Sequence, residues 1–312
     1  MLRIALAGVP GQLAQSDKTA SGIHIQMAID PDYLLTREWP EITHRYTEKD
    51  SMLYALGVGL GRDPLNQDEL RFVYEDGLKV MPSQAVTLAH PGFWAAEKDI
   101  NLDWVRLLHL GQEIVWHQPL PTAGEVAATT RFTDVVDKGA RAGALIVTER
   151  VVRLVETGED IATVITTILA RGDGGFSSER RSVPQEKDRI PDREADIVCD
   201  LPTFPQQALL YRLSGDLNPL HASPQVAGDA GYSQPILHGL CTMGVATHAL
   251  MKVCCHYEPE RFKRIRLRFS APVYPGETIR TEIWREGQTI AFRCWSLEQE
   301  KVVINNGYLE IS

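Results

Sequence analysis

Three polar side chains suited to activating a water molecule occur within six positions of one short segment. The segment YRLSGDLNPLHASPQ, residues 211–225, contains Asp216, Asn218 and His221, with a Gly before them and a Pro among them. A carboxylate and an imidazole five positions apart in a Pro-kinked loop can both face one water and exchange protons with it. The amide of Asn218 can orient a neighbour but cannot titrate. The spacing predicts acid–base chemistry, with a helix cap or an Asx turn as the simpler alternatives.

A fourth candidate, Gly239, begins a long apolar segment downstream of this loop. The stretch HGLCTMGVATHALMKVCC, residues 238–255, has one formally charged residue, Lys252, and apolar side chains on every helical face. A helix of this kind must be enclosed by other structure. Its first N–H groups lack intrahelical partners, and a Gly there lets a carbonyl oxygen approach closely. We therefore expect the Gly239 N–H to stabilise a developing oxyanion.

Strand patterns surround this helix. In the second half IRLRFSAPV alternates apolar and basic residues, TIRTEIW and TIAFRCWSL flank the turn REGQ, and VVINNGYLEI closes the chain. The first half offers EVAATTRFTDV, GALIVTERVVRLV and IATVITTILA, and its central segment MPSQAVTLAHPGFWAA contains two prolines. Alternation of this kind predicts strands, and the prolines predict a short or broken helix. Each half is thus predicted to curl an antiparallel sheet around a central helix.

An internal repeat relates the two halves. LYALGVG at 53–59 matches LYRLSGD at 210–216, an offset of 157 positions, and PLPTAGEV from 119 echoes PVYPGET from 272. Such a repeat indicates duplication of one domain. At this offset the three polar positions of the second copy hold Gly59, Gly61 and Pro64 in the first. We therefore predict one catalytic copy and one silent copy, whose broken helix leaves room for a bulky apolar ligand.

The predicted organisation has four parts. Residues 1–25 are interpreted as a leader or an expression remnant, 26–172 as a non-catalytic repeat, 173–196 as a charged Gly- and Pro-bearing linker, and 197–312 as the catalytic repeat. The second and fourth parts are long enough for one domain each.

Composition excludes several classes of protein. The 312 residues are 44% hydrophobic and 23% charged with a formal net charge of −9, which argues against nucleic-acid or anionic-membrane binding. No apolar run approaches the ~20 residues that span a bilayer. The five cysteines form no CxxC pattern, so we expect reduced core thiols in an intracellular compartment and neither a disulfide framework nor a zinc site. The C-terminal YLEIS is not the Ser-Lys-Leu type of peroxisomal address.

The motifs YRLSGDLNPLHASP, GYSQPILHGLCT and RFSAPVYPGET together resemble the MaoC-like, type 2 enoyl-CoA hydratase family. YTEKDSMLYALGVG and ARGDGGF in the first half resemble its two-repeat eukaryotic form. The resemblance implies an α+β double hot-dog fold and reversible hydration of trans-2-enoyl-CoA to (R)-3-hydroxyacyl-CoA in β-oxidation. It also implies a catalytic role for Asp216, Asn218, His221 and Gly239. Asp216 is expected to exchange the proton, and His221 to orient the water or share the acid–base role.

The same resemblance bears on partners and compartment. No cofactor is expected, because coenzyme A is part of the enoyl-CoA and 3-hydroxyacyl-CoA substrates. A homodimer without nucleic acid or a membrane span is expected. The family implies a peroxisomal location, with cytoplasm and mitochondrion open. Two rival functions remain: an acyl-CoA thioesterase on the same fold, and a non-catalytic acyl-CoA-binding subunit.

Coenzyme A phosphates require basic or backbone donors. Arg264 and Arg266 share one strand face with Arg268, and ARGDGGF places Arg171, Gly172 and Gly174 in a flexible loop. These residues and His238 are the candidate coenzyme A contacts, with a solvated strand face as the alternative for the arginines. His238 is also interpreted as a support for the catalytic loop. A metal site built from Asp216, His221 and His238 or His248 lacks a tight ligand spacing, so no metal is predicted.

Overall fold

The computed structural model describes residues 29–97, 99–103, 106–177 and 190–312. The predicted leader at 1–25 and part of the predicted linker, 178–189, lie outside the described residues.

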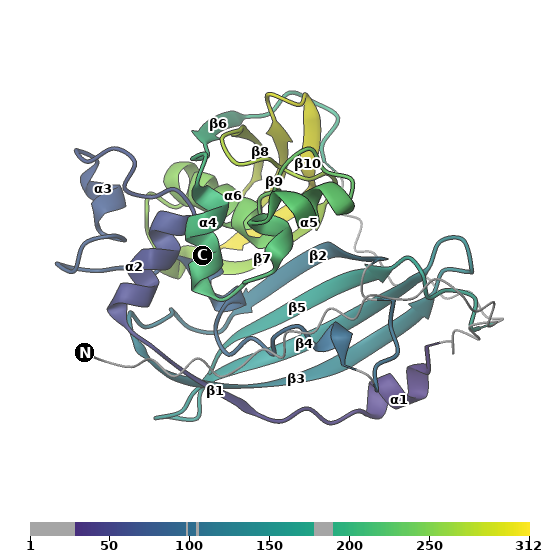
Figure 1. The fold of residues 1–312 in the computed structure, drawn as a ribbon. Helices are drawn as coiled ribbons and strands as arrows, with labels where there is room; N and C mark the ends of the chain where they lie inside the picture. Colours follow the sequence, from purple (N-terminus) through teal and green to yellow (C-terminus); the bar gives the residue numbers. More distant parts are fainter. Residues whose placement is uncertain (1–28, 98, 104–105, 178–189) are drawn as a thin grey trace, which may run out of the picture.

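Ten antiparallel strands form one continuous sheet in the order β1-β3-β4-β5-β2-β7-β10-β9-β8-β6 (Figure 1). The first half contributes β1 (Ile42–Tyr46), β2 (Leu107–Trp116), β3 (Gly124–Asp137), β4 (Ala144–Leu154) and β5 (Asp160–Ala170). The second half contributes β6 (Ile197–Pro202), β7 (Phe262–Phe269), β8 (Thr278–Glu286), β9 (Thr289–Ser296) and β10 (Lys301–Ile311). The halves join where β2 pairs with β7, with Ile114 opposite Ile265. The seven predicted strand segments are confirmed as β3, β4, β5, β7, β8, β9 and β10, whereas β1, β2 and β6 were not predicted.

The helices are short except for one. They are α1 (Pro31–Thr36), α2 (Glu48–Gly57), α3 (Gln67–Leu70), η1 (Pro82–Val86), η2 (Trp94–Ala96), α4 (Gln207–Tyr211), η4 (Arg212–Ser214), η5 (Pro219–His221), α5 (Pro224–Asp229), α6 (Gly239–Cys254) and η6 (Pro259–Arg261). In the first half the central helix is reduced to the single 3₁₀ turns η1 and η2, each begun near a proline or a glycine. Both the long helix and the broken one were therefore predicted correctly.

Helix α6 forms the centre of the second half and of the main apolar core. Its side chains are buried from Cys241 to Met251, and they pack with Ile265 and Leu267 of β7. The contact with the first half is close, because a Cβ atom on Gly244 would lie 2.3 Å from Cγ1 of Val58. The helix is thus enclosed by both repeats, as its all-round apolar character predicted. All five cysteines are buried free thiols, which confirms the expected core thiols.

The sequence repeat has a direct spatial counterpart. Tyr54 of α2 and Tyr211 of α4 are 157 positions apart, and their ring centroids lie 5.8 Å from each other in the core. The Cβ position of Gly57 lies 3.3 Å from the Cα of Tyr211, so the two helices approach closely. The duplicated elements therefore pack against each other, and the chain folds into an internal pair of hot-dog units.

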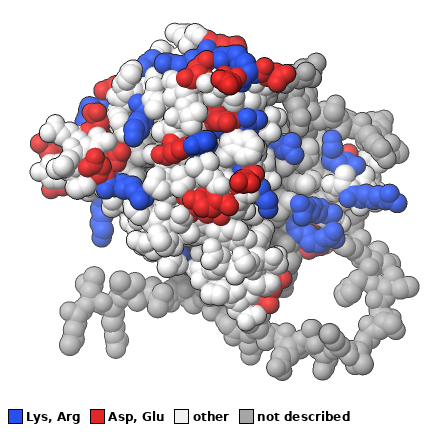
Figure 2. Space-filling view, turned by 90° about the horizontal axis from the view of Figure 1, so that it is seen from above, with Lys and Arg blue, Asp and Glu red and all other residues white. Residues whose placement is uncertain are grey.

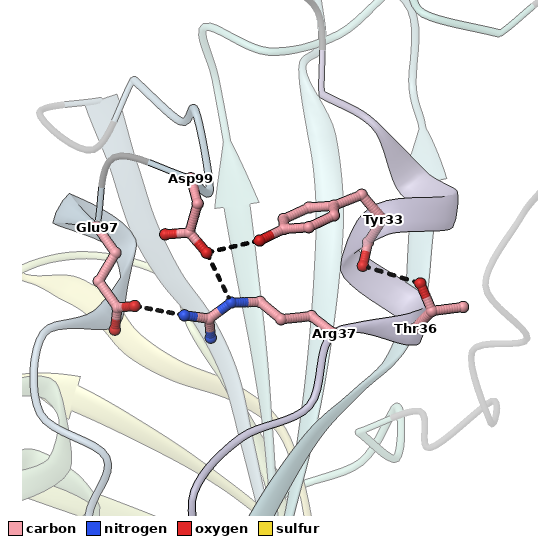
Figure 3. Close-up of polar contacts among 5 residues, drawn as sticks. All are labelled: Tyr33, Thr36, Arg37, Glu97 and Asp99. Carbon is pink, nitrogen blue, oxygen red and sulfur yellow. Dashed lines mark hydrogen bonds and ion pairs between the residues drawn. The ribbon is translucent and has the colours of Figure 1, made fainter.

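A second, smaller apolar cluster lies at the far ends of the first-half strands. Trp94 and Phe132 pack edge to face beside Trp39, and α1 covers them with Leu34. Figure 3 shows how α1 is fastened: Tyr33 Oη donates to Asp99 over 2.6 Å, and Arg37 bridges Asp99 and Glu97. These bonds attach α1 to the segment after η2.

The start of the predicted linker is bound to the first repeat. The Asp137 carboxylate accepts hydrogen bonds from the N–H groups of Gly139, Gly175 and Ser177, and these bonds lower its pKa against the effect of desolvation. At the other end of the linker, Trp284 donates its Nε1–H to the Arg193 carbonyl. The exact boundaries of the two repeats remain a prediction.

No helix in the described ranges is long and apolar enough to cross a membrane. Figure 2 shows acidic and basic side chains interspersed over the upper and left parts of one face, and mainly basic side chains on its right side.

The contact between Gly244 and Val58 gives a stability prediction. Gly244→Ala should lower the free energy of unfolding, because overpacking costs ~1–3 kcal/mol and exceeds the helix-propensity gain of at most ~1 kcal/mol. Gly228→Ala in α5 is the matched control, since a Cβ there meets nothing within 4 Å. Urea unfolding should show the control unchanged or stabilised. Equal midpoints for both variants would contradict the packing argument.

Candidate active site

The loop that precedes α5 is held in shape by its own polar side chains. Gly215 adopts a φ of 125°, which only glycine adopts without strain. Asp216 Oδ1 then accepts from the Asn218 N–H over 3.1 Å, and Asn218 Oδ1 accepts from the Leu220 N–H over 3.0 Å. Asn218 is the N-cap of η5, the turn that ends in His221. The simpler alternatives, an Asx turn and a helix cap, therefore both occur, and they orient the catalytic candidates.

His221 has a defined tautomer. Its Nδ1 lies 2.8 Å from the Ile236 carbonyl oxygen, which can only accept, so Nδ1 carries the proton and Nε2 is left with a lone pair. Burial lowers the pKa of His221, and the Ile236 hydrogen bond and the Asp216 charge oppose this effect. The buried imidazole is therefore neutral near neutral pH and offers Nε2 as a hydrogen-bond acceptor or base.

His238 packs against the His221 imidazole. The two rings stack with centroids 3.7 Å apart and an interplanar angle of 26°. His238 Nε2 donates to the Asp216 backbone carbonyl over 3.2 Å. The ring centroid of Tyr211 lies 5.0 Å from that of His238. Desolvation and then His221 lower the pKa of His238 to about 4. These contacts match the predicted support of the catalytic loop.

The N-terminus of α6 lies beside the two histidines. His238 is the N-cap and Gly239 the first helical residue. A Cβ on Gly239 would rest 3.4 Å from the ring of Phe269 at the end of β7, so glycine keeps the approach to this N–H open. The first N–H groups of a helix have no intrahelical partner, and the helix dipole favours negative charge there. The arrangement can therefore hold a developing oxyanion next to Asp216 and His221.

The first half contributes a histidine that sequence reasoning missed. His109 of β2 packs edge to face on Phe269 with centroids 4.9 Å apart, and desolvation lowers its pKa while Asp216 opposes the shift. Its ring therefore lies beside the phenylalanine that borders Gly239. No local motif marks this residue, so only the fold brings it to the site.

The cluster suits a bound water better than a metal ion. One ligating atom from each of Asp216, His221 and His238 lies within 4.8 Å of the other two. However, the lone pairs of an imidazole lie in its plane, and in nearly parallel stacked rings they do not converge on one ion at about 2.0–2.1 Å. His248 lies elsewhere, 3.7 Å from Glu69. A water, in contrast, can donate one hydrogen to Asp216 and the other to His221 Nε2.

His238, one of the candidate coenzyme A residues, lies in this cluster, whereas the two arginine candidates on β7 lie on the outer face of the sheet. Ile265 and Leu267 face α6, so Arg264 and Arg266 occupy the opposite, outer face of β7. Arg264 pairs with Glu113 over 2.6 Å, and Arg266 lies over the Tyr308 ring.

The glycines of ARGDGGF are explained by packing. A Cβ on Gly172 would lie 2.8 Å from a carboxylate oxygen of Asp103, and one on Gly174 would lie 2.4 Å from the Gly139 carbonyl. These glycines permit the close approach of the chain after β5, and Arg171 lies exposed beside them. Their role toward coenzyme A stays a prediction.

Comparison with known proteins agrees with this architecture. The family model described as MaoC like domain matches residues 186–306, and the one described as MFE-2 hydratase 2 N-terminal domain matches residues 44–172. The fold is a double hot dog; a solved Mycobacterium tuberculosis protein described by that fold aligns with a TM-score of 0.52 at 13% identity, over 88% of this chain and 94% of that one.

Closer relatives define the family. The chain is 38% identical to "Enoyl-CoA hydratase 2, peroxisomal" of Arabidopsis thaliana, over 90% of this chain and 94% of the relative. It is 40% identical to "3-hydroxyacyl-thioester dehydratase Y" of Mycobacterium tuberculosis, over 91% and 99%. A solved MaoC-like dehydratase from Phytophthora capsici aligns with a TM-score of 0.78 at 32% identity, over 90% and 98%. The chain therefore belongs to the MaoC-like, type 2 enoyl-CoA hydratase family.

The buried His238 makes stability depend on pH. Its folded pKa of about 4 lies below the ordinary 6.5, so between these values the unfolded chain takes up a proton that the folded chain does not. The free energy of unfolding should fall as the pH drops from 6.5 to about 4. Below about pH 4 His238 should cause no further change, because it is then protonated in the folded chain too. Urea unfolding of His238→Gln should show a shallower fall than the wild type. His117→Gln, at an exposed position, is the control, and a slope unchanged in His238→Gln would refute the assignment.

Proposed function

We propose that this protein is an (R)-specific 2-enoyl-CoA hydratase, a hydro-lyase of fatty-acyl β-oxidation. The observation that carries the proposal is that Asp216 and His221 each place a ligating side-chain atom within 4.8 Å of the other, beside the N-terminus of α6, while the Ile236 hydrogen bond occupies Nδ1 of His221. Membership of the family, with relatives named as enoyl-CoA hydratases, supports the same reaction.

The chemistry follows from the donors and acceptors present. A water that donates both hydrogens, to Asp216 and to His221 Nε2, directs a lone pair toward C3 of the enoyl group. As the C3–O bond forms, the C2=C3 electrons move toward C2 and the thioester oxygen becomes an enolate, which the Gly239 N–H stabilises. Asp216 takes the water proton and returns it to C2, so hydroxyl and hydrogen add across the double bond. Removing one oxyanion donor of this type typically costs ~10²–10³-fold in rate.

The two repeats have different roles in this proposal. The second repeat supplies Asp216, Asn218, His221 and Gly239, whereas Gly59, Gly61 and Pro64 occupy the corresponding positions of the first. The first repeat, whose central helix is reduced to η1 and η2, accommodates the acyl chain. Arg171, Arg264 and Arg266 are the proposed contacts of the coenzyme A phosphates.

The wider setting follows from the reaction. Hydration changes no oxidation state overall and consumes only water, so we propose no cofactor beyond the coenzyme A of the substrate. We propose the peroxisome as the compartment, on the printed name of the Arabidopsis relative, and a homodimer as the assembly.

Asp216→Asn should abolish hydration, with a loss of ~10²–10⁴-fold for an acid–base residue. The loss of enoyl-thioester absorbance with crotonyl-CoA and a longer trans-2-enoyl-CoA measures the rate, and chiral analysis of the product tests for the (R) isomer. Asp63→Asn is the matched control, because Asp63 Oδ1 accepts from the Leu65 N–H in the same kind of turn within the silent repeat. Release of free coenzyme A thiol would instead identify a thioesterase, and binding without turnover an acyl-CoA-binding subunit.

The neutral His221 predicts the acid side of the pH–rate profile. Because burial lowers its pKa, kcat/KM should stay high as the pH falls through the ordinary histidine value of about 6.5 and decline only below it, when Nε2 becomes protonated and can no longer accept. The profile is measured with crotonyl-CoA under subsaturating conditions. A decline centred above the ordinary value would refute the neutral-base assignment.

A further inference from the structure

The inner face of the first-half sheet is not uniformly apolar. The main core covers one end of its strands, for example Ile114 of β2 and Val164 of β5. The second cluster covers the other end, for example Phe132 of β3 and Ile146 of β4. The two clusters are separate, although the strands run through both.

A row of polar residues lies between them. On each of the strands β2 to β5, the apolar pattern of the inner face is interrupted at one or two positions. We call the residues at these positions the polar belt: Gln112, Thr130, Thr148, Arg150 and Thr166. The strand register makes the belt continuous, because Thr130 lies opposite Arg150, and Thr166 lies opposite both Thr148 and Gln112. Thr166 Oγ1 donates to Gln112 Oε1 over 3.1 Å.

Arg150 is the one charged member of the polar belt. It is 5% exposed, and its Nη2 donates to the carbonyl oxygens of Val86 and Ala85 over 2.7 and 3.4 Å. Its Nε has no hydrogen-bond partner, and no carboxylate pairs with it in the described part of the chain. Burial lowers its pKa to about 10, so it is still charged near neutral pH. Burying a charge without an acid partner is costly, and two carbonyls offset only part of that cost.

The polar belt starts at the active site. His109 Nε2 lies 3.0 Å from Gln112 Oε1, and the His109 ring packs on Phe269, which borders Gly239. From Gln112 the polar belt continues across the sheet through Thr166 and Thr148 to β4, the strand that carries Arg150. A chain that leaves the reacting carbons beside Gly239 and follows the belt therefore reaches the Arg150 guanidinium.

We propose that Arg150 selects acyl-CoA substrates whose acyl chain carries a carboxylate, and that this carboxylate supplies the acid partner that the folded chain lacks. The polar belt forms the path along which that chain lies. The inference rests on the proposed function for the position of the thioester, and it adds the substrate class. An unsubstituted alkyl chain offers no hydrogen-bond acceptor to Arg150. A carboxylate, in contrast, accepts charge-assisted hydrogen bonds from the guanidinium.

Binding of saturated acyl-CoAs tests the proposal without relying on turnover. Isothermal titration compares a homologous series of ω-carboxyacyl-CoAs with their methyl esters and with unsubstituted acyl-CoAs of matching length. At the best-fitting length the wild type should bind the carboxylate form at least about tenfold more tightly than either neutral form, the minimum for one charge-assisted bond. No preference for the carboxylate at any length would overturn the proposal, even if the variants below fail to fold.

The variants locate the effect. Arg150→Met should remove the carboxylate preference while keeping affinity for the unsubstituted chains, and Arg150→Lys should retain part of it. Arg131→Met is the matched control, because Arg131 pairs with Glu149 on the exposed face of the same two strands. A preference that survives in Arg150→Met would overturn the role of Arg150. Hydration of the corresponding trans-2-enoyl-CoAs, followed in parallel, separates a failure of this inference from a failure of the hydratase assignment.

Discussion

The structure depends on the enclosure of one apolar helix. Helix α6 has no polar face to present to water, so both repeats must pack around it. Gly244 lets Val58 of the first repeat approach the helix closely, and β7 covers another side with Ile265 and Leu267. This enclosure fixes the helix N-terminus, and with it the only backbone donors that α6 can offer to a ligand.

The loop that carries Asp216 and His221 is held to that N-terminus by a short chain of polar contacts. His238 caps α6, stacks on His221 and donates to the Asp216 carbonyl. The Ile236 carbonyl sets the tautomer of His221 from the other side. Because both imidazoles are desolvated, their pKa values are lowered and they remain neutral acceptors. Position and protonation state therefore come from the same packing.

The two repeats differ in the elements that form the site. The second has the polar loop and the long helix, and the first has neither. In place of a long helix, η1 covers part of the inner face of the first-half sheet, where Arg150 donates to the Ala85 and Val86 carbonyls. Thr148 and Arg150 on β4 are buried polar residues on that face, and in our proposal a bound acyl chain supplies the partner that Arg150 lacks.

The sequence by itself determined the two repeats, the long and the broken helix, seven of the ten strands, and the catalytic candidates Asp216, Asn218, His221 and Gly239. These features are local, since periodicity, prolines and loop spacing act over a few residues. It also held an unused signal: Arg150 is a charge at an inward position of an otherwise apolar strand face. Only the tertiary structure decided that His109 packs on Phe269 beside Gly239 and that β2 joins β7. Such contacts join residues more than a hundred positions apart, and no local pattern encodes which distant strands will pair.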